Sequence, residues 1–163
     1  MKILSMKTTI FLGAMLSLLV CLMFTGCSNS ETNSTSRGLT DFAHIEEEYL
    51  ATIDSLNWPD GITLPDKLED EDTGASFQVG YGETRASYLW EYSWMKEWLD
   101  TYNTDPERAE KALEELEKAF DMPHMGIDRC DDATRNYLRE NIEKAKLGDP
   151  SGFTESIRAN YAN

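Results

Sequence analysis

The sequence predicts an all-α protein, a small helical bundle of four to five helices with a long irregular loop between helices 1 and 2. Apolar residues recur at steps of three and four through most of residues 39–161, which is the period of a helix face. Only SFQV, residues 76–79, has the composition of a strand. We therefore expect helix-on-helix packing around a single core.

The first two helices are predicted on either side of a segment rich in Pro, Gly and acidic residues. One apolar face covers residues 39–56, with Thr40 as its expected N-cap and NWPDG, residues 57–61, ending the helix. Prolines, glycines and the acidic run EDED interrupt the pattern over residues 59–80, so an extended, mobile connection is expected there, either a disordered acidic loop or a functional one. A second helix is predicted over residues 83–102.

Three further helices are expected in the C-terminal half. Residues 105–120 begin with Asp105 as the cap and Pro106 at the first helical position, the arrangement that starts a helix. Asp131 or Asp132 is expected to cap a fourth helix that runs to about Leu147. Its predicted inward-facing residues are Tyr137, Leu138, Ile142 and Ala145. Residues 153–161 indicate a short last helix.

The second predicted helix carries three tryptophans, Trp90, Trp94 and Trp98, spaced four residues apart. Its apolar arc covers more than half of the circumference, which predicts a central helix with neighbours on two or three sides. Glu91 projects within the aromatic arc. A buried carboxylate requires a partner, and the candidates are Trp or Tyr donors or an arginine from another helix: Arg135, Arg139 or Arg158.

The same residues support a second interpretation. Aromatic walls with one acid bind a cationic group or stack on a sugar. Under this interpretation the ligand-binding residues are Trp90, Glu91, Trp94 and Trp98, at the mouth of an aromatic cleft.

The N-terminus has the pattern of a secretory signal. Lys2 and Lys7 precede an apolar run over residues 10–24, which ends at Thr25, Gly26 and Cys27. The ending FTGC resembles the lipobox of bacterial lipoproteins, although Phe24 stands where that motif more often has an aliphatic residue. The resemblance implies cleavage before Cys27, lipidation of Cys27 and an extracytoplasmic protein held on the cell membrane by a lipid anchor. An uncleaved membrane anchor is the alternative.

These features divide the chain into a signal peptide, residues 1–26, a lipidated Cys with a flexible tether, residues 27–38, and a single helical domain, residues 39–163. Removing residues 1–26 takes away two lysines and no acid, so 15 basic and 30 acidic residues become 13 and 30, a net charge of −17. This charge argues against nucleic acid as a partner. Cys130 has no partner within the chain if Cys27 is lipidated, and is expected to be a small buried hydrophobe.

The search for catalytic and metal-binding motifs gives little. No GxSxG, phosphate loop or nucleotide fingerprint occurs, so the sequence favours a protein that is not an enzyme and needs no cofactor. Met122, His124 and Met125 are weak candidates for a monovalent copper site, because thioether and imidazole ligands suit that ion.

The sequence thus predicts a non-catalytic binding or accessory protein of the bacterial cell envelope. Its expected partners are the membrane, reached through the lipid anchor, and an envelope protein or cell-wall component. A small-ligand or cell-wall sugar binder and a copper-handling protein are the alternatives.

Overall fold

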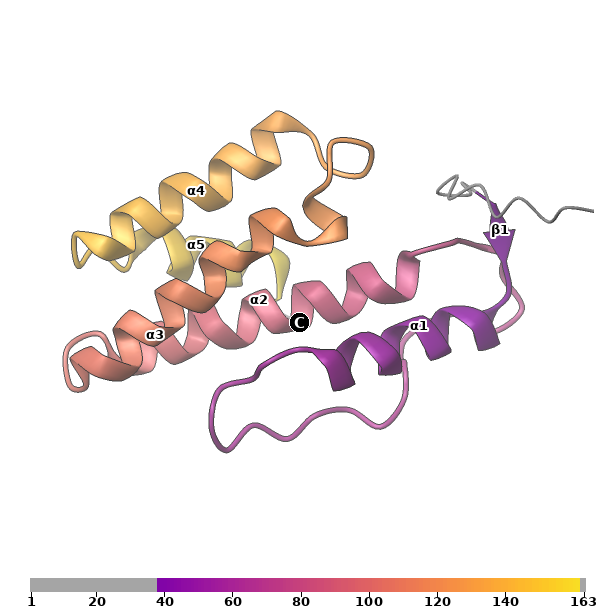
Figure 1. Ribbon diagram of the computed structural model, residues 1–163, viewed down its shortest axis with the longest axis horizontal. Helices are drawn as coiled ribbons and strands as arrows, with labels where there is room; N and C mark the ends of the chain where they lie inside the picture. Colours follow the sequence, from indigo (N-terminus) through magenta and orange to yellow (C-terminus); the bar gives the residue numbers. More distant parts are fainter. Residues whose placement is uncertain (1–37, 162–163) are drawn as a thin grey trace, which may run out of the picture. The chain divides into compact units, whose positions relative to one another are not determined.

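The computed structural model describes residues 38–161, which belong to one compact unit, residues 35–163. Within the described residues, five α-helices are joined by turns, two 3-10 helices and a two-stranded ladder (Figure 1). The elements are β1 Leu39–Thr40, α1 Phe42–Ser55, β2 Phe77–Gln78, α2 Tyr81–Thr101, α3 Pro106–Glu117, η1 Lys118–Asp121, η2 Pro123–Met125, α4 Asp132–Lys146 and α5 Ser151–Asn160. The predicted all-α class is confirmed. The predicted signal peptide and Cys27 lie outside the described residues.

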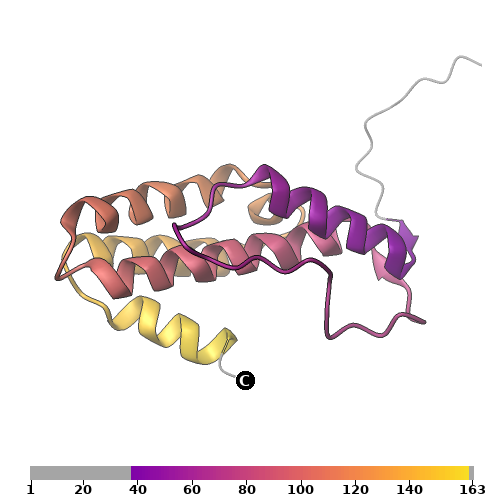
Figure 2. The same cartoon turned by 90° about the horizontal axis from the view of Figure 1, so that it is seen from below.

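Helix α2 is the central helix of this unit, as its wide apolar arc predicts. It contacts α1, α3, α5 and η2, and Figure 2 shows α1 and α5 on different sides of it. The three tryptophans of α2 are almost completely buried, with Trp90 and Trp94 each 1% exposed and Trp98 2% exposed. They form the main core with residues of the C-terminal helices: Ala112, Leu116, Leu138, Ile142 and Phe153.

A second, smaller core lies between α1 and the first part of α2, and its buried residues are Ile45, Tyr49, Ile53, Leu68 and Ala86. At this contact the two helices approach closely. The Glu48 side chain of α1 accepts backbone N–H groups that begin α2, from Gly80 at 2.8 Å and from Gly82 at 3.2 Å. Since the first N–H groups of a helix lack partners within it, this carboxylate both caps α2 and fixes α1 against it.

The start of α1 differs from the sequence prediction. Asp41, rather than Thr40, is the N-cap, and its side chain accepts the N–H of His44 at 3.1 Å. Thr40 instead pairs with Phe77 in the antiparallel ladder between β1 and β2. The expectation of Thr40 as the cap was wrong. Thr40 and Asp41 are adjacent and both have side chains that can cap a helix, and pairing in the ladder leaves Thr40 in the strand, one residue before the cap.

The long connection between α1 and α2 is extended, as predicted. Contrary to the expected mobility, its residues make defined contacts with the helices. Leu68 is 4% exposed in the smaller core, and its N–H donates to Glu46 of α1 at 3.3 Å. Glu71 accepts the Tyr81 hydroxyl at 2.7 Å and forms an ion pair with Arg85 of α2. Through Glu71, the acidic run therefore holds the connection against Arg85 of α2.

Helices α3 and α4 begin where the sequence indicates, and α5 begins at Ser151, two residues before the predicted start. Asp105 accepts the N–H of Arg108 at 3.2 Å at the start of α3, and Asp131 accepts that of Thr134 at 2.7 Å at the start of α4. Tyr137, expected to face inward, is 41% exposed. Its position among apolar residues of α4 was misleading because it lies at the edge of a cavity rather than in the core.

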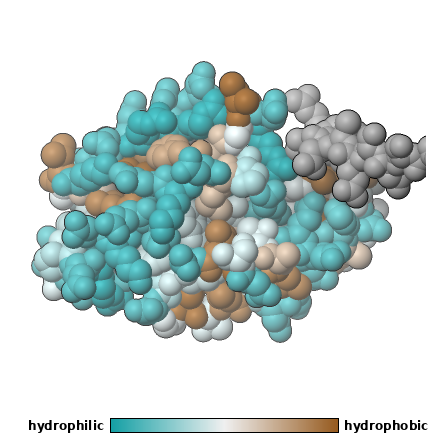
Figure 3. All heavy atoms as spheres, viewed as in Figure 1, coloured by the Kyte–Doolittle hydropathy of each residue, from teal (hydrophilic) through white to brown (hydrophobic). Residues whose placement is uncertain are grey.

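The face of the protein seen in Figure 3 is mostly hydrophilic, with small apolar areas between polar ones. Among residues 38–161, no helix combines the length and the apolar character that a membrane crossing requires.

Candidate functional site

A cavity of about 390 Å³ lies among α2, α4, α5 and the segment that contains η2. This volume is within the range of small-molecule sites, roughly 300–1,000 Å³. Its wall combines tyrosine rings and apolar side chains with a few polar groups, from Tyr88, Glu91, Met95, Met125, Thr134, Tyr137, Leu138, Ser156, Asn160 and Tyr161. Glu91 is the only acidic or basic residue among them.

The carboxylate of Glu91 is held by a histidine from η2. Glu91 Oε1 lies 2.6 Å from His124 Nε2, and the two side chains are 6% and 1% exposed. The expected partner, Arg135, Arg139 or Arg158, was therefore wrong. Arg135 instead donates to the backbone carbonyls of Met125 and Cys130 and pairs with Asp132. Arg139 lies over the ring of Phe120, and Arg158 is exposed on α5.

His124 holds the Glu91 carboxylate through one ring nitrogen. Nε2 is in hydrogen-bond contact with Glu91 Oε1, whereas the second ring nitrogen, Nδ1, is buried without a hydrogen-bond partner in the described part of the chain. His124 is not among the residues that line the cavity, so it orients the carboxylate from outside the cavity wall.

Two tyrosines of the cavity lie within the field of this carboxylate. Burial, followed by the negative charge of Glu91, raises the pKa of both Tyr88 and Tyr161 above the usual value of a phenol. The Tyr161 hydroxyl donates to the backbone carbonyl of Tyr88 at 3.2 Å, and its ring contacts that of Tyr92 with centroids 4.9 Å apart. These contacts connect the end of α5 to α2, so the cavity has a defined wall on this side.

The structure does not bring the tryptophans and Glu91 to one cavity. The indole N–H groups of Trp90 and Trp94 both donate to the backbone carbonyl of Asn57, at 2.6 and 3.2 Å, and neither ring lines the Glu91 cavity. Trp98 lies at a different place, a groove of about 440 Å³ between α3 and α4. A role for Trp90, Trp94 and Trp98 in binding stays a prediction.

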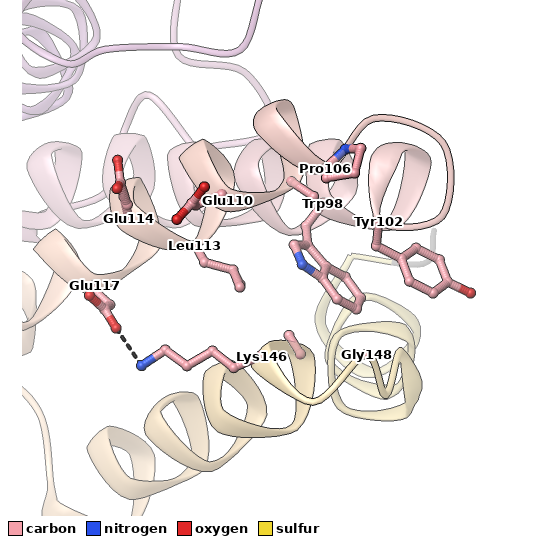
Figure 4. A pocket seen from close by; sticks show the side chains of 11 residues that line it. Trp98, Tyr102, Pro106, Glu110, Leu113, Glu114, Glu117, Lys146 and Gly148 are labelled. Atoms are coloured by element: carbon pink, nitrogen blue, oxygen red, sulfur yellow. Dashed lines mark ion pairs between the residues drawn. The ribbon is translucent and has the colours of Figure 1, made fainter.

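The groove beside Trp98 is shown in Figure 4. Trp98 and Leu113 point into the space between the helices, and Lys146 extends along one side to an ion pair with Glu117 at 2.6 Å. Glu110 and Glu114 are exposed on α3. A small-ligand site needs polar groups that converge on the ligand. The Glu91 cavity, with its buried carboxylate, meets this requirement better than the groove.

The candidate copper residues have other partners. His124 Nε2 is engaged by Glu91, and Met125, 3% exposed, has its sulfur 3.6 Å from Cys130 Sγ. Met122 is partly buried against the main core. No group of three or more His, Cys, Asp and Glu residues suited to a metal ion occurs within residues 38–161. A copper site at Met122, His124 and Met125 stays a prediction.

We expect the Cys130 thiol to be alkylated by iodoacetamide at about pH 8 several-fold more slowly in the folded protein than in urea. Partial burial, more than any neighbouring charge, raises its pKa, and the thiolate is the reactive form. The folded rate should therefore rise as the pH increases beyond the usual range of a free thiol. Mass spectrometry of the Cys130 peptide measures both rates, and equal rates would contradict this environment.

Comparison with known proteins identifies no relative. No family model matches the chain, and no curated protein or solved structure matches it significantly. The site therefore has to be interpreted from its own chemistry.

Proposed function

We propose that this protein is a lipid-anchored, extracytoplasmic and non-catalytic binding protein of the bacterial cell envelope, which holds a small ligand in the Glu91 cavity. One observation carries the ligand-binding part: a buried carboxylate faces a cavity of about 390 Å³ whose other lining groups are uncharged. Burying a carboxylate costs stability unless it has partners. A ligand that interacts with Glu91 would add a second partner beside His124.

The anchoring part rests on the N-terminal sequence. The basic start, the apolar run and the FTGC motif support export and lipidation at Cys27. Acyl chains contribute about 0.8 kcal/mol per buried methylene, so two or more chains give a stable anchor. A protein with 30 acidic and 15 basic residues has no net attraction to anionic lipid headgroups, so the acyl chains would supply the attachment.

The paired Glu91 and His124 also resemble the acid and base of an enzyme, which is why the non-catalytic role needs an argument. A histidine that acts as a general base holds the carboxylate on one ring nitrogen and the nucleophile on the other. Here Nδ1 of His124 is buried and has no partner among the described residues. The pair leaves the carboxylate, rather than the imidazole, in the cavity wall, which favours binding over proton transfer.

The test is a thermal-shift screen of the protein purified from membranes, with small amines, amino acids, sugars and muropeptide fragments as probes. At least one probe class should raise Tm by several degrees at saturating concentration, because a ligand that binds only the folded state stabilises it. The same purified protein should begin at an acylated Cys27 when its intact mass is measured. A polypeptide recovered from the cytosol with Met1 and no fatty acid would overturn the anchoring part.

A matched pair of variants makes the screen specific for the cavity. Thr134→Trp places a large ring at the exposed rim of the cavity and keeps the backbone N–H that Asp131 accepts. Asn136→Trp places the same ring on the same helix outside the cavity. Thr134→Trp should abolish the shift and Asn136→Trp should keep it. No shift with any probe, or equal shifts in both variants, would overturn a ligand site here.

A further inference from the structure

We infer that the ligand of the Glu91 cavity is a small organic cation that carries an alkylated ammonium group. This inference rests on the proposed function and specifies its ligand class. It follows from three features of the cavity wall: one carboxylate with no basic residue among the lining residues, a set of tyrosine rings, and several apolar side chains.

The charge is the first step. The lining residues include Glu91 and no Lys, Arg or His. The partner of Glu91, His124, is not among the lining residues, so a ligand in the cavity meets the carboxylate and not the imidazole. Arg135 of α4, the residue after the lining residue Thr134, is held by two backbone carbonyls and Asp132. The cavity therefore attracts a cation and repels an anionic ligand.

The aromatic rings are the second step. Tyr88, Tyr137 and Tyr161 line the cavity from three different helices or their ends, α2, α4 and the C-cap of α5. Tyrosine rings that line one cavity with a carboxylate offer the groups that recognise quaternary ammonium ions, with cation–π attraction of about 0.5–2 kcal/mol per favourable contact. Tyr88 and Tyr137 are 42% and 41% exposed, so their rings stand at the entrance and are accessible to a ligand.

The apolar side chains are the third step, and they distinguish an alkylated from a primary ammonium group. Met95, Met125 and Leu138 contribute thioether and methyl surface to the wall. A primary ammonium has three N–H donors, each of which needs an acceptor when it is buried. A trimethylated group has none, and its methyl groups gain from contact with the same apolar wall. The cavity thus suits a ligand with a methylated cationic head.

The experiment compares choline with its neutral isostere, in which a tert-butyl group replaces the trimethylammonium group. Isothermal titration of the full chain, as purified from membranes, should detect choline and give a Kd at least about tenfold lower than that of the isostere, since only choline carries the charge. Glu91→Gln retains the shape of the side chain, and we expect it to reduce this difference several-fold, leaving only the part that the tyrosine rings contribute. Equal affinity of the two compounds, or absence of choline binding, would overturn the inference.

Two further variants keep the result interpretable. Glu115→Gln removes one negative charge from another nearly buried carboxylate, on α3 and outside the cavity, so it should leave choline binding unchanged. Tyr137→Leu removes one exposed ring without a change of charge, and we expect a loss of about two- to fivefold in affinity. If Glu115→Gln weakened binding as much as Glu91→Gln, the attraction would come from net charge, and the cavity would not be the site.

The outcome also separates this inference from the proposed function. If a neutral sugar or muropeptide raises Tm in a way that Thr134→Trp abolishes while choline does not bind, the ligand class is wrong and the ligand site stands. If no probe binds, both are wrong.

Discussion

Replacing Trp90 by Ala should lower the free energy of unfolding by about 3–5 kcal/mol, the usual cost of truncating a large buried aromatic side chain. Trp90 is 1% exposed in the main core, and its indole N–H donates to the Asn57 carbonyl at 2.6 Å. A domain of this size has a total stability of about 5–15 kcal/mol. The loss would therefore be a large fraction of the whole, and urea unfolding followed by circular dichroism measures it.

Trp90→Phe separates the volume of the ring from its hydrogen bond. Phe fills most of the space but cannot donate, and the Asn57 carbonyl still accepts the N–H of Trp94 at 3.2 Å. We expect a smaller loss for Trp90→Phe than for Trp90→Ala, about 1–2 kcal/mol. If Trp90→Ala cost less than about 1 kcal/mol with an unchanged denaturant slope, Trp90 would not be a core residue.

The positions of the helices could be predicted from the sequence because the information is local. Asp105 with Pro106, and Asp131 before an apolar face, specify helix starts through contacts within one turn. The central place of α2 follows from the width of its apolar arc. Thr40 and Asp41 show the limit of this argument, since two adjacent residues can both cap and only the pairing of Thr40 with Phe77 decides between them.

The candidate site could be predicted only in part. The position of Glu91 within an aromatic arc indicates a buried carboxylate that needs a partner, and the structure supplies one. The identity of that partner could not be inferred from the residues near Glu91, because His124 is 33 residues away on a 3-10 helix. Its neighbours Met122 and Met125 instead suggested metal ligands. If histidines had been considered together with arginines as partners for Glu91, His124 would have been among the candidates.

The tyrosines of the cavity were missed for a different reason. Tyr137 and Tyr161 lie on apolar faces of α4 and at the end of α5, so periodicity assigns both to the core. Periodicity identifies the face of a helix that turns inward, and it does not distinguish a packed interior from the wall of a cavity. That distinction depends on how far apart α2, α4 and α5 lie, which no single helix specifies.

Gly82→Ala should destabilise the protein by at least about 2 kcal/mol, although Ala usually stabilises a helix by about 1 kcal/mol relative to Gly. A Cβ atom at Gly82 would lie 1.8 Å from the backbone oxygen of Ile45 and 2.9 Å from the backbone nitrogen of Tyr49. Both obstacles are backbone atoms of α1, so no side-chain rotation relieves the clash. The helices have to separate, and Glu48 then loses its bonds to the N–H groups that begin α2.

The strongest effect should fall on α1, because its main helix contact is with α2. Hydrogen exchange of Gly82→Ala should show α1 opening before α3 and α4, whose packing against the second half of α2 remains intact. Gly74→Ala is the matched control, because its Cβ would meet only a side-chain oxygen at 3.4 Å. If Gly82→Ala were as stable as Gly74→Ala and protected α1 equally, the two helices could not approach as closely as the structure places them.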